Sequence, residues 1–287
     1  MDEVTPLEVK CSGTIPFTVS IVIPLFNQLA YTRMCLESLR TTIPEEVEII
    51  LVDNASTDGT AVYLATLGGV GVIGNSENRG FAGACNQGIR AASGEWIVVM
   101  NNDVILSSGW LEGLWSAARR WGLDMVSPAI REGEHNYDIE ENARTLTERM
   151  NGVIRRGMVS GICFMTHRKV FDAIGLFDEN FRIGQYEDKD LFLRAVRAGF
   201  RLGTVGNAFL HHFGSITQKS VKRSGAGKQY ALENRAYFIR KWKLPWWRRA
   251  LDRNVNKLMS RICSLRERMQ YGHTLMEKWI DGQLHYD

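Results

Sequence analysis

VSIVIPLFN (residues 19–27) and VEIILVD (residues 47–53) are the two stretches that decide the fold. Each is a short apolar run, rich in β-branched residues, that ends at a polar residue. This is the pattern of a strand buried on both faces. Residues 28–40 between them place apolar side chains at helical spacing. A strand, a helix and a second apolar strand at this spacing predict a parallel α/β sheet.

Two further apolar runs, 70–73 and 96–100, predict strands, and residues 81–92 predict a helix between them. Polar residues follow the four predicted strands: Asn27, Asp53, Asn78 and Asp103. Open α/β sheets bind ligands beyond the carboxyl ends of their strands, so these residues predict a site. The alternative is that Asn and Asp only end strands and cap helices here.

The second half of the sequence is less regular. Its predicted elements are an extended run at 159–165, helices at 168–174 and 187–198, and extended runs at 201–205 and 208–211. Residues 131–152 are polar and lack a period, which predicts a mobile or inserted segment.

The composition is that of a globular protein. The 287 residues are 45% hydrophobic and 23% charged, which excludes a disordered or fibrous chain. No apolar run reaches the length of a membrane span, and the first residues do not predict a secretory signal. The five cysteines are scattered and form no C-x-x-C pair, which argues against a disulfide framework or a cysteine zinc site. We therefore expect a cytoplasmic protein with reduced thiols.

Several of these segments together resemble family-2 glycosyltransferases, in particular the rhamnosyltransferase-like members. The motifs, in order, are SIVIPLFN (20–27), ILVDNASTD (50–58), NRGFAGACNQG (78–88), VVMNND (98–103), FDE (177–179), YEDKDL (186–191) and HFGS (212–215). Each motif is short, but their order and spacing over residues 19–217 are specific.

The resemblance implies a GT-A fold, which is a Rossmann-like α/β fold with a mostly parallel sheet between helices, here with a C-terminal helical extension. It divides the chain into a lead-in (1–18), a nucleotide-sugar-binding half (19–125), an acceptor-binding and catalytic half (126–240) and a basic helical tail (241–287). It also implies transfer of a hexose or deoxyhexose, with inversion, from a nucleotide-diphosphate sugar, with UDP- or dTDP-sugars favoured. The implied acceptor is a hydroxyl of a surface glycan or a lipid-linked saccharide.

The resemblance implies Asp103 and His212 as ligands of Mn²⁺ or Mg²⁺. A cation is useful because the leaving diphosphate develops negative charge. Asn101 stands where the family usually has its first acidic residue, which removes one charge but keeps an acceptor oxygen. His211 and His212 point in opposite directions in an extended segment, so only one can face the site. His212 lies 24 residues after Asp188, the spacing of the family's metal-binding histidine.

Inversion needs one base that takes a proton from the acceptor hydroxyl. The resemblance assigns this role to Asp188, with Glu187 helping to orient the acceptor or the loop. The start of a predicted helix favours the ionised form of Asp188. The alternative is that these acids only enrich the first turn of a helix.

The remaining predicted site residues bind the donor: Pro24, Phe26, Asn27, Asp53, Asn78, Gly80, Asn101 and Asn102. Asp53 is a candidate to accept the N–H of the base, and Phe26 offers a flat face to it. Gly80 would let the backbone approach the nucleotide closely. Basic residues within 219–223 either close over the diphosphate or form a solvated loop.

From Arg240 onward the chain carries a net charge of +6, against −3 for the rest. Apolar residues there step by four and three like the seam of a coiled coil: Leu251, Val255, Leu258, Ile262, Leu265 and Met269. Three alternatives stay open for this seam, namely packing on the protein's own body, forming a homodimer, and resting on an anionic membrane, which would place the protein peripherally at the inner face. No nucleic-acid-binding motif is recognised, so nucleic acid is not an expected partner.

Three other functions compete with a glycosyltransferase. A non-catalytic nucleotide-sugar-binding protein is suggested by Asn101 but opposed by the Glu187-Asp188 pair and His212. A nucleotidyltransferase would normally show a Gly-rich basic loop after the first strand, which residues 24–27 do not provide. An interaction protein would act through its tail, and deleting residues 246–287 would separate this case from an enzyme.

Overall fold

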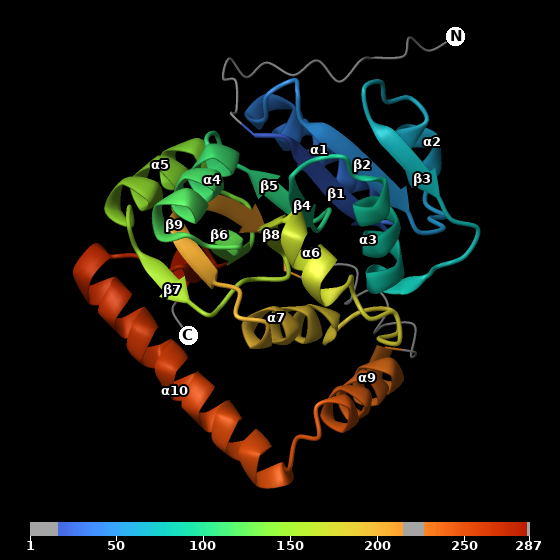
Figure 1. The fold of residues 1–287 in the computed structure, drawn as a ribbon. Helices are drawn as coiled ribbons and strands as arrows, with labels where there is room; N and C mark the ends of the chain where they lie inside the picture. The colour runs from blue at the N-terminus through green and yellow to red at the C-terminus, as the bar shows by residue number, and fades with distance from the viewer. Residues whose placement is uncertain (1–16, 215–226, 286–287) are drawn as a thin grey trace.

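The computed structural model describes residues 17–214 and 227–285 (Figure 1). Its first part alternates strands and helices as the sequence predicts. The elements are β1 (Val19–Leu25), α1 (Leu29–Thr42), β2 (Glu48–Asp53), α2 (Thr60–Leu64), β3 (Gly71–Gly74), α3 (Gly80–Ala91) and β4 (Trp96–Met100). β1 lies between β2 and β4, and β3 pairs with β2, all in parallel. The carboxyl ends of these strands therefore meet at one edge of the sheet.

In the second part, both parallel and antiparallel strands join the sheet. Its elements are β5 (Val104–Leu106), α4 (Trp110–Trp121), β6 (Met125–Gly133), α5 (Ile139–Arg149), β7 (Ile154–Arg156), β8 (Cys163–His167), α6 (Arg168–Ile174), α7 (Glu187–Arg197) and β9 (Leu202–His212). β8 runs antiparallel between β4 and β6, and β9 is parallel to β6 but antiparallel to β5 and β7. The sheet is parallel on the β1 side and mixed beyond β4.

Two expectations for this part were wrong. Residues 131–152 contain helix α5, which the side chain of Asp138 caps by accepting the N–H of Glu141 at 2.9 Å. The two extended runs expected at 201–205 and 208–211 form one strand, β9, whose pairing with β6 shifts at Pro128/Ala129. A local irregularity of one strand thus separates the two runs in the sequence pattern.

The C-terminal part is more than a helical tail. Helices α9 (Gly227–Lys241) and α10 (Trp246–Tyr271) are followed by strands β10 (Met276–Ile280) and β11 (Gln283–His285). β10 pairs in parallel with β6, so the chain returns to the main sheet, whose order is β11-β10-β6-β8-β4-β1-β2-β3. Helical structure throughout residues 241–287 was therefore a wrong expectation.

Apolar residues fill both faces of the sheet. On one face, Ile21 and Ile23 of β1 pack with buried side chains of α1 and α4. On the other face, Val22 of β1 packs with buried side chains of α3, α6 and α7. The helices cover the sheet in this way in Figure 1. Burial on both faces explains why the strands read as continuously apolar runs.

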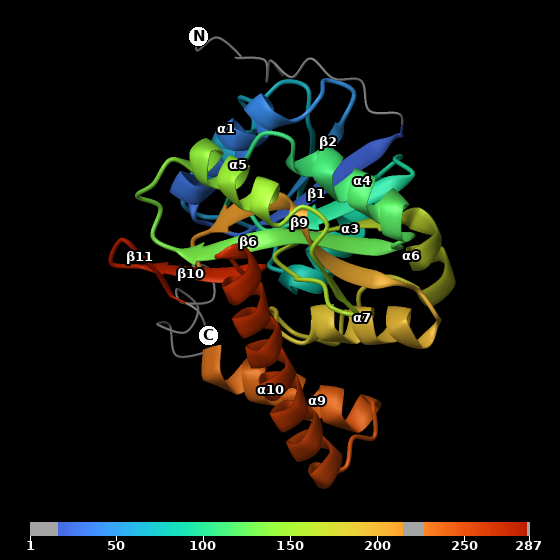
Figure 2. The same cartoon turned by 90° about the vertical axis from the view of Figure 1, so that its left-hand side faces the viewer.

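Two buried ion pairs fasten the C-terminal part to the body. Arg155 of β7 bonds to Glu267 of α10 at 2.6 Å, and Arg131 of β6 bonds to Glu277 of β10 at 2.8 Å. The remainder of α10 extends away from the sheet (Figure 2). The seam residues Val255, Leu258, Ile262, Leu265 and Met269 are all exposed, so packing of this seam on the protein's own body was a wrong alternative. No helix within residues 17–214 or 227–285 has the length and apolar character that crossing a membrane requires.

The contact between α3 and β1 gives a test of the packing. A Cβ atom at Gly88 would lie 2.3 Å from Cγ1 of the buried Val22. We expect Gly88→Ala to lower the free energy of unfolding by about 1–3 kcal/mol, as overpacking of a tight core does. Denaturant unfolding measures it, and Gly74→Ala is the control because a Cβ there meets nothing within 4 Å. Equal stability of both variants would contradict the packing of α3 on β1.

Candidate functional site

A cavity of about 470 Å³ opens at the carboxyl ends of β1 and β4. It lies where ligands bind in open α/β sheets. Most of the predicted site residues line it: Pro24, Phe26, Asn78, Asn101, Asn102, Asp103, Glu187, Asp188 and His212. The predicted residues Asn27, Asp53 and Gly80 are outside its lining. The site thus joins segments that are far apart in the sequence.

Asn27 and Asp53 shape the loop that follows β2. The side-chain oxygen of Asn27 accepts the N–H of Thr57 at 2.7 Å, and Asp53 accepts the N–H of Ser56 at 3.0 Å. Asn54, which the sequence analysis did not single out, lines the cavity instead. Its amide bonds to the side chain of Asn78 at 2.8 Å and to the carbonyl of Gly80 at 3.1 Å. Asn54, and not Asp53, is thus the residue after β2 whose side chain lines the cavity.

Gly80 allows a close approach, but of another segment of the chain. Its φ is +74°, and a Cβ there would lie 3.0 Å from the backbone nitrogen of Ile183. The next residue, Phe81, donates its N–H to the carbonyl of Ile183 at 2.8 Å. Glycine is required because the loop before Glu187 rests directly on the start of α3.

The residues after β4 form one wall of the cavity. Asn101, Asn102 and Asp103 all contribute to the lining. The amide of Asn102 donates to Thr32 of α1 at 2.8 Å, which fixes this turn against a helix. Asp103 is buried, and its carboxylate lies 3.4 Å from Nε2 of His212.

His212 and His211 face opposite sides of β9. His212 lines the cavity, with Nδ1 3.3 Å from the carboxylate of Glu132 and Nε2 next to Asp103. Burial alone would lower the pKa of His212, but hydrogen bonds to Asp103 and Glu132, and the charges of both, raise it to about 9. Nδ1 of His211 bonds to the hydroxyl of Tyr137 at 2.9 Å, away from the cavity. The alternation of a strand accounts for this difference.

Glu187 and Asp188 begin α7 and face the cavity. Burial, and then the charge of Asp188, raise the pKa of Glu187 to about 7. The expectation that the helix start favours the ionised form of Asp188 was wrong in its net effect, because burial outweighs the backbone hydrogen bonds and raises the pKa of Asp188 above its ordinary value. A Cβ at Gly161 would lie 2.6 Å from Oδ2 of Asp188, so a glycine at this place makes room for the carboxylate. Two neighbouring carboxyls with raised pKa values in a cavity are typical of a functional site.

The loop 182–186, which leads into Glu187, has an unusual backbone. Ile183, Gln185 and Tyr186 all have a positive φ although none is a glycine. The buried side chain of Asn234 in α9 holds this loop. Its amide donates to the carbonyls of Arg182, Gly184 and Gln185 at 2.9–3.1 Å, and its oxygen accepts the N–H of Arg182 at 3.0 Å.

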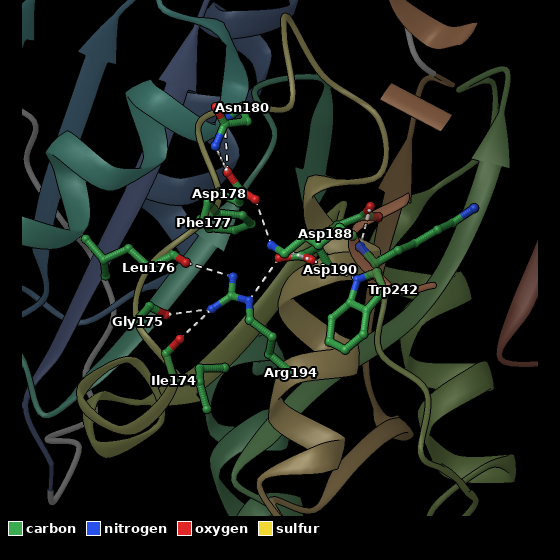
Figure 3. A network of polar contacts seen from close by, with 12 residues as sticks. Ile174, Gly175, Leu176, Phe177, Asp178, Asn180, Asp188, Asp190, Arg194 and Trp242 are labelled. Carbon is green, nitrogen blue, oxygen red and sulfur yellow. Dashed lines mark hydrogen bonds and ion pairs between the residues drawn. The ribbon is translucent and has the colours of Figure 1, made fainter. Parts of the chain in front are cut away.

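A second set of contacts ties α9 to α7 (Figure 3). The fully buried Asp190 accepts hydrogen bonds from Trp242 and Arg194, both at 2.9 Å. Lys241 bridges Asp190 at 2.8 Å and Asp178 at 2.7 Å. Arg194 also donates to the carbonyls of Ile174 and Leu176, so the chain before Asp178 is held as well. The contacts fix the start of α7 from two sides.

Sequence reasoning missed the contribution of α9. Tyr230 of this helix lines the cavity and is buried. Its hydroxyl and Oε2 of Glu187 have no hydrogen-bond partner among residues 17–214 and 227–285. Only the three-dimensional contact identifies Tyr230, because a tyrosine in a polar helix has no motif around it. The expected basic residues of 219–223 lie outside the described residues.

Asp103 and His212 could hold a divalent cation, because a carboxylate and an imidazole suit Mn²⁺ or Mg²⁺ and stand side by side at the wall. In the part of the chain that the structure describes, no group of three or more His, Cys, Asp or Glu side chains could hold a metal ion. Two protein ligands leave room for oxygen ligands from a substrate.

Comparison with known proteins identifies the family. The family model "Glycosyl transferase family 2" matches residues 20–175, more than half of the chain. N-acetylglucosaminyl-diphospho-decaprenol L-rhamnosyltransferase of Mycobacterium tuberculosis is 27% identical over 259 residues, which cover 75% of this chain and 82% of that protein. Glycosyltransferase AglE of Haloferax volcanii is 24% identical, with 82% of this chain and 81% of that protein covered. Glycosyltransferase GlyG of Streptococcus pneumoniae is 30% identical, but the match spans only 42% of this chain and 40% of that protein.

Two solved structures share the fold. GalNAc-T7 with UDP, GalNAc and Mn²⁺ superimposes with a TM-score of 0.56 at 17% identity, covering 69% of this chain and 44% of that one. Mannosyltransferase PcManGT from Pyrobaculum calidifontis, in complex with GDP-Man and Mn²⁺, gives a TM-score of 0.53 at 20% identity, with 71% and 59% covered. The expected GT-A fold is therefore confirmed, and the chain belongs to glycosyl transferase family 2.

Proposed function

We propose that this protein transfers a hexosyl or deoxyhexosyl residue, with inversion, from a UDP- or dTDP-sugar to a hydroxyl of its acceptor. One observation carries the proposal. A single cavity has Pro24 and Phe26 at one side, Asp103 and His212 at its wall, and the Glu187-Asp188 pair facing it. A nucleotide, a diphosphate and an acceptor hydroxyl need these three environments in one place.

The nucleotide part of the donor binds at the ends of β1 and β2. Phe26 presents a partly exposed ring, and Asn54 and Asn78 present amides that the loop holds in place. Asp53 and Asn27 act indirectly, because they fix the turn that carries Asn54. Asn101 and Asn102, next to Asp103, bind the ribose or the first phosphate.

Asp103 and His212 hold the divalent cation in this proposal. A cation bound there would supply electrostatic stabilisation of the leaving diphosphate. Glu132 holds Nδ1 of His212, so that Nε2 points to Asp103 and the cavity. Because residue 101 is an asparagine, Asp103 is the one acidic residue of the motif VVMNND (98–103).

Asp188 is the base of the proposed reaction. Its carboxylate takes the proton of the acceptor hydroxyl as the oxygen attacks the anomeric carbon and the bond to the diphosphate breaks. The raised pKa of Asp188 makes its carboxylate a better proton acceptor than an exposed aspartate. Glu187 and Tyr230 have buried polar atoms without a partner among the described residues, so they are suited to bind hydroxyls of the acceptor.

The proposed acceptor is a lipid-linked saccharide or a surface glycan under assembly. The Mycobacterium tuberculosis relative is an N-acetylglucosaminyl-diphospho-decaprenol L-rhamnosyltransferase. Similarity over 75% of this chain supports the same acceptor class and a deoxyhexose donor. We place the reaction at the cytoplasmic side of the membrane, where such a lipid would be reached.

Replacement of the base separates chemistry from binding. We expect Asp188→Asn to lower kcat at least about a hundredfold, because general-base catalysis contributes that much or more. Donor affinity should change less than about threefold, since the cation site is intact. Initial rates of nucleotide diphosphate release and calorimetric titration of the donor measure the two quantities. Asp172→Asn, at an exposed position of α6, is the control, and full activity of Asp188→Asn would exclude Asp188 as the base.

The donor nucleotide can be identified without an acceptor. We expect UDP or dTDP with Mn²⁺ to raise the Tm by a few degrees, because ligand at a hundred times its Kd adds about 2.7 kcal/mol. GDP, CDP and ADP should shift the Tm less, and a chelator should remove most of the effect. Asp103→Ala should abolish the part that depends on Mn²⁺, whereas Asp172→Ala should keep it. A shift in Asp103→Ala that equals that of the unchanged protein would show that Asp103 does not act through a cation.

The buried carboxyl pair predicts a pH dependence of stability. Glu187 has a pKa of about 7 in the folded protein and an ordinary value of 4.5, so the folded state binds the proton more tightly. Stability therefore falls as the pH rises from about 4.5 to 7. We expect Glu187→Gln to remove on the order of 2 kcal/mol of this fall. Urea unfolding of both proteins at pH 5 and pH 7.5 measures it, and parallel pH profiles would show that Glu187 has no raised pKa.

A further inference from the structure

The outward face of α10 is apolar and uncovered. Between residues 254 and 271 it presents exposed apolar side chains at the spacing of one helix face: Val255, Leu258, Met259, Ile262, Leu265 and Met269. Their exposed fractions range from 46% to 80%. A continuous stripe of this kind is different from the single exposed apolar residues of ordinary surfaces, and it marks an interaction site.

The opposite face of the helix is fixed to the body. Ser264 and Glu267 are buried, and both bond to Arg155 of β7. Ile262 and Leu265 each precede one of these residues by two positions, which turns them about 200° around the helix axis. The apolar stripe must therefore point away from the body for as long as the ion pair holds.

The charges beside the stripe have one sign. Lys257, Arg261 and Arg266 are exposed on this part of α10. The one acidic residue within 254–271 is Glu267, and the ion pair with Arg155 neutralises it. The stripe is thus flanked by the positive charges of Arg261 and Arg266, with no acidic residue other than Glu267 within 254–271.

These charges oppose a pairing with a second copy. In a parallel pair of helices that uses the stripe as its seam, Arg261 of one copy lies opposite Arg266 of the other on both flanks. Like charges at these flanking positions oppose association. The apolar stripe with its positive border instead complements a surface that is both apolar and anionic.

We propose that α10 binds the surface of an anionic lipid bilayer and lies in its plane. The apolar side chains enter the boundary between headgroups and acyl chains, and the arginines reach lipid phosphates from the flanks. An interfacial helix of this kind combines an apolar face with basic residues, as α10 does. The proposal rests on α10 alone and is independent of the donor and acceptor proposed above.

Binding of the protein to vesicles tests the proposal. We expect co-sedimentation with vesicles of phosphatidylcholine and phosphatidylglycerol, and much weaker co-sedimentation with phosphatidylcholine alone. Ile262→Ser combined with Leu265→Ser should lower the affinity at least about tenfold, because two apolar side chains leave the boundary. Arg261→Gln combined with Arg266→Gln should lower it by a similar factor and weaken its dependence on salt.

Matched variants control for composition and charge. Val62→Ser removes an apolar side chain that is exposed on α2, and Arg144→Gln with Arg156→Gln removes two exposed charges elsewhere. Both should keep vesicle binding, and unchanged Tm values show that all variants are folded. Absence of binding to anionic vesicles would overturn the proposal, as would equal binding by the α10 variants. A dimer in light scattering that the Ile262/Leu265 variant dissociates, without vesicle binding, would assign the stripe to a second copy instead.

Discussion

The start of α7 depends on the hydrogen bonds that Asn234 makes to the loop 182–186. Three non-glycine residues of that loop adopt a positive φ, which costs on the order of 1–2 kcal/mol each. Such a backbone persists only where its surroundings hold it. That restraint comes from the four hydrogen bonds of the buried Asn234. The close packing of Ile183 against Gly80 adds to it. The positions of Glu187 and Asp188 follow from this restraint. Helix α9 is therefore part of the site, although, among the described residues, Tyr230 is the only one of this helix in the cavity lining.

The local sequence pattern was sufficient to predict the strands that are buried on both faces. The strands at 19–25, 48–53 and 96–100 are continuously apolar because helices cover both faces of the sheet, and this leaves an unambiguous signal. Helix α5 was missed although its apolar residues, Ile139, Ala143, Leu146 and Met150, recur at helical spacing, because they are few and stand among polar residues. Its start was still readable, since Asp138 precedes Glu141 by three positions, as in a capping box. Strand β10 has a mixed sequence, and its pairing with β6 spans more than a hundred residues.

The site residues that belong to sequence motifs could be predicted. Those that reach the site only through contacts in the folded chain could not. Asp103, Glu187, Asp188 and His212 lie in motifs, and the structure brings all four to one cavity. Asn54 replaces its neighbour Asp53 in the lining, because the turn after β2 directs the two side chains differently. Gly161 lies beside Asp188, and Tyr230 lines the same cavity as Glu187, and no periodicity of the sequence encodes either position.

The pairing of β10 with β6 affects how the protein can be assembled during synthesis. Arg131 is fully buried, and its partner Glu277 follows it by 146 residues. A nascent chain that has already made β6 must keep this guanidinium in water until β10 emerges, because a buried charge without a partner costs several kcal/mol. Strands β1 to β4 pair with one another within the first hundred residues, so this pairing can form before β10 is made. The edge of the sheet at β6 and β10 forms only after β10 has been made. The strands made first can then serve as a template onto which this edge docks.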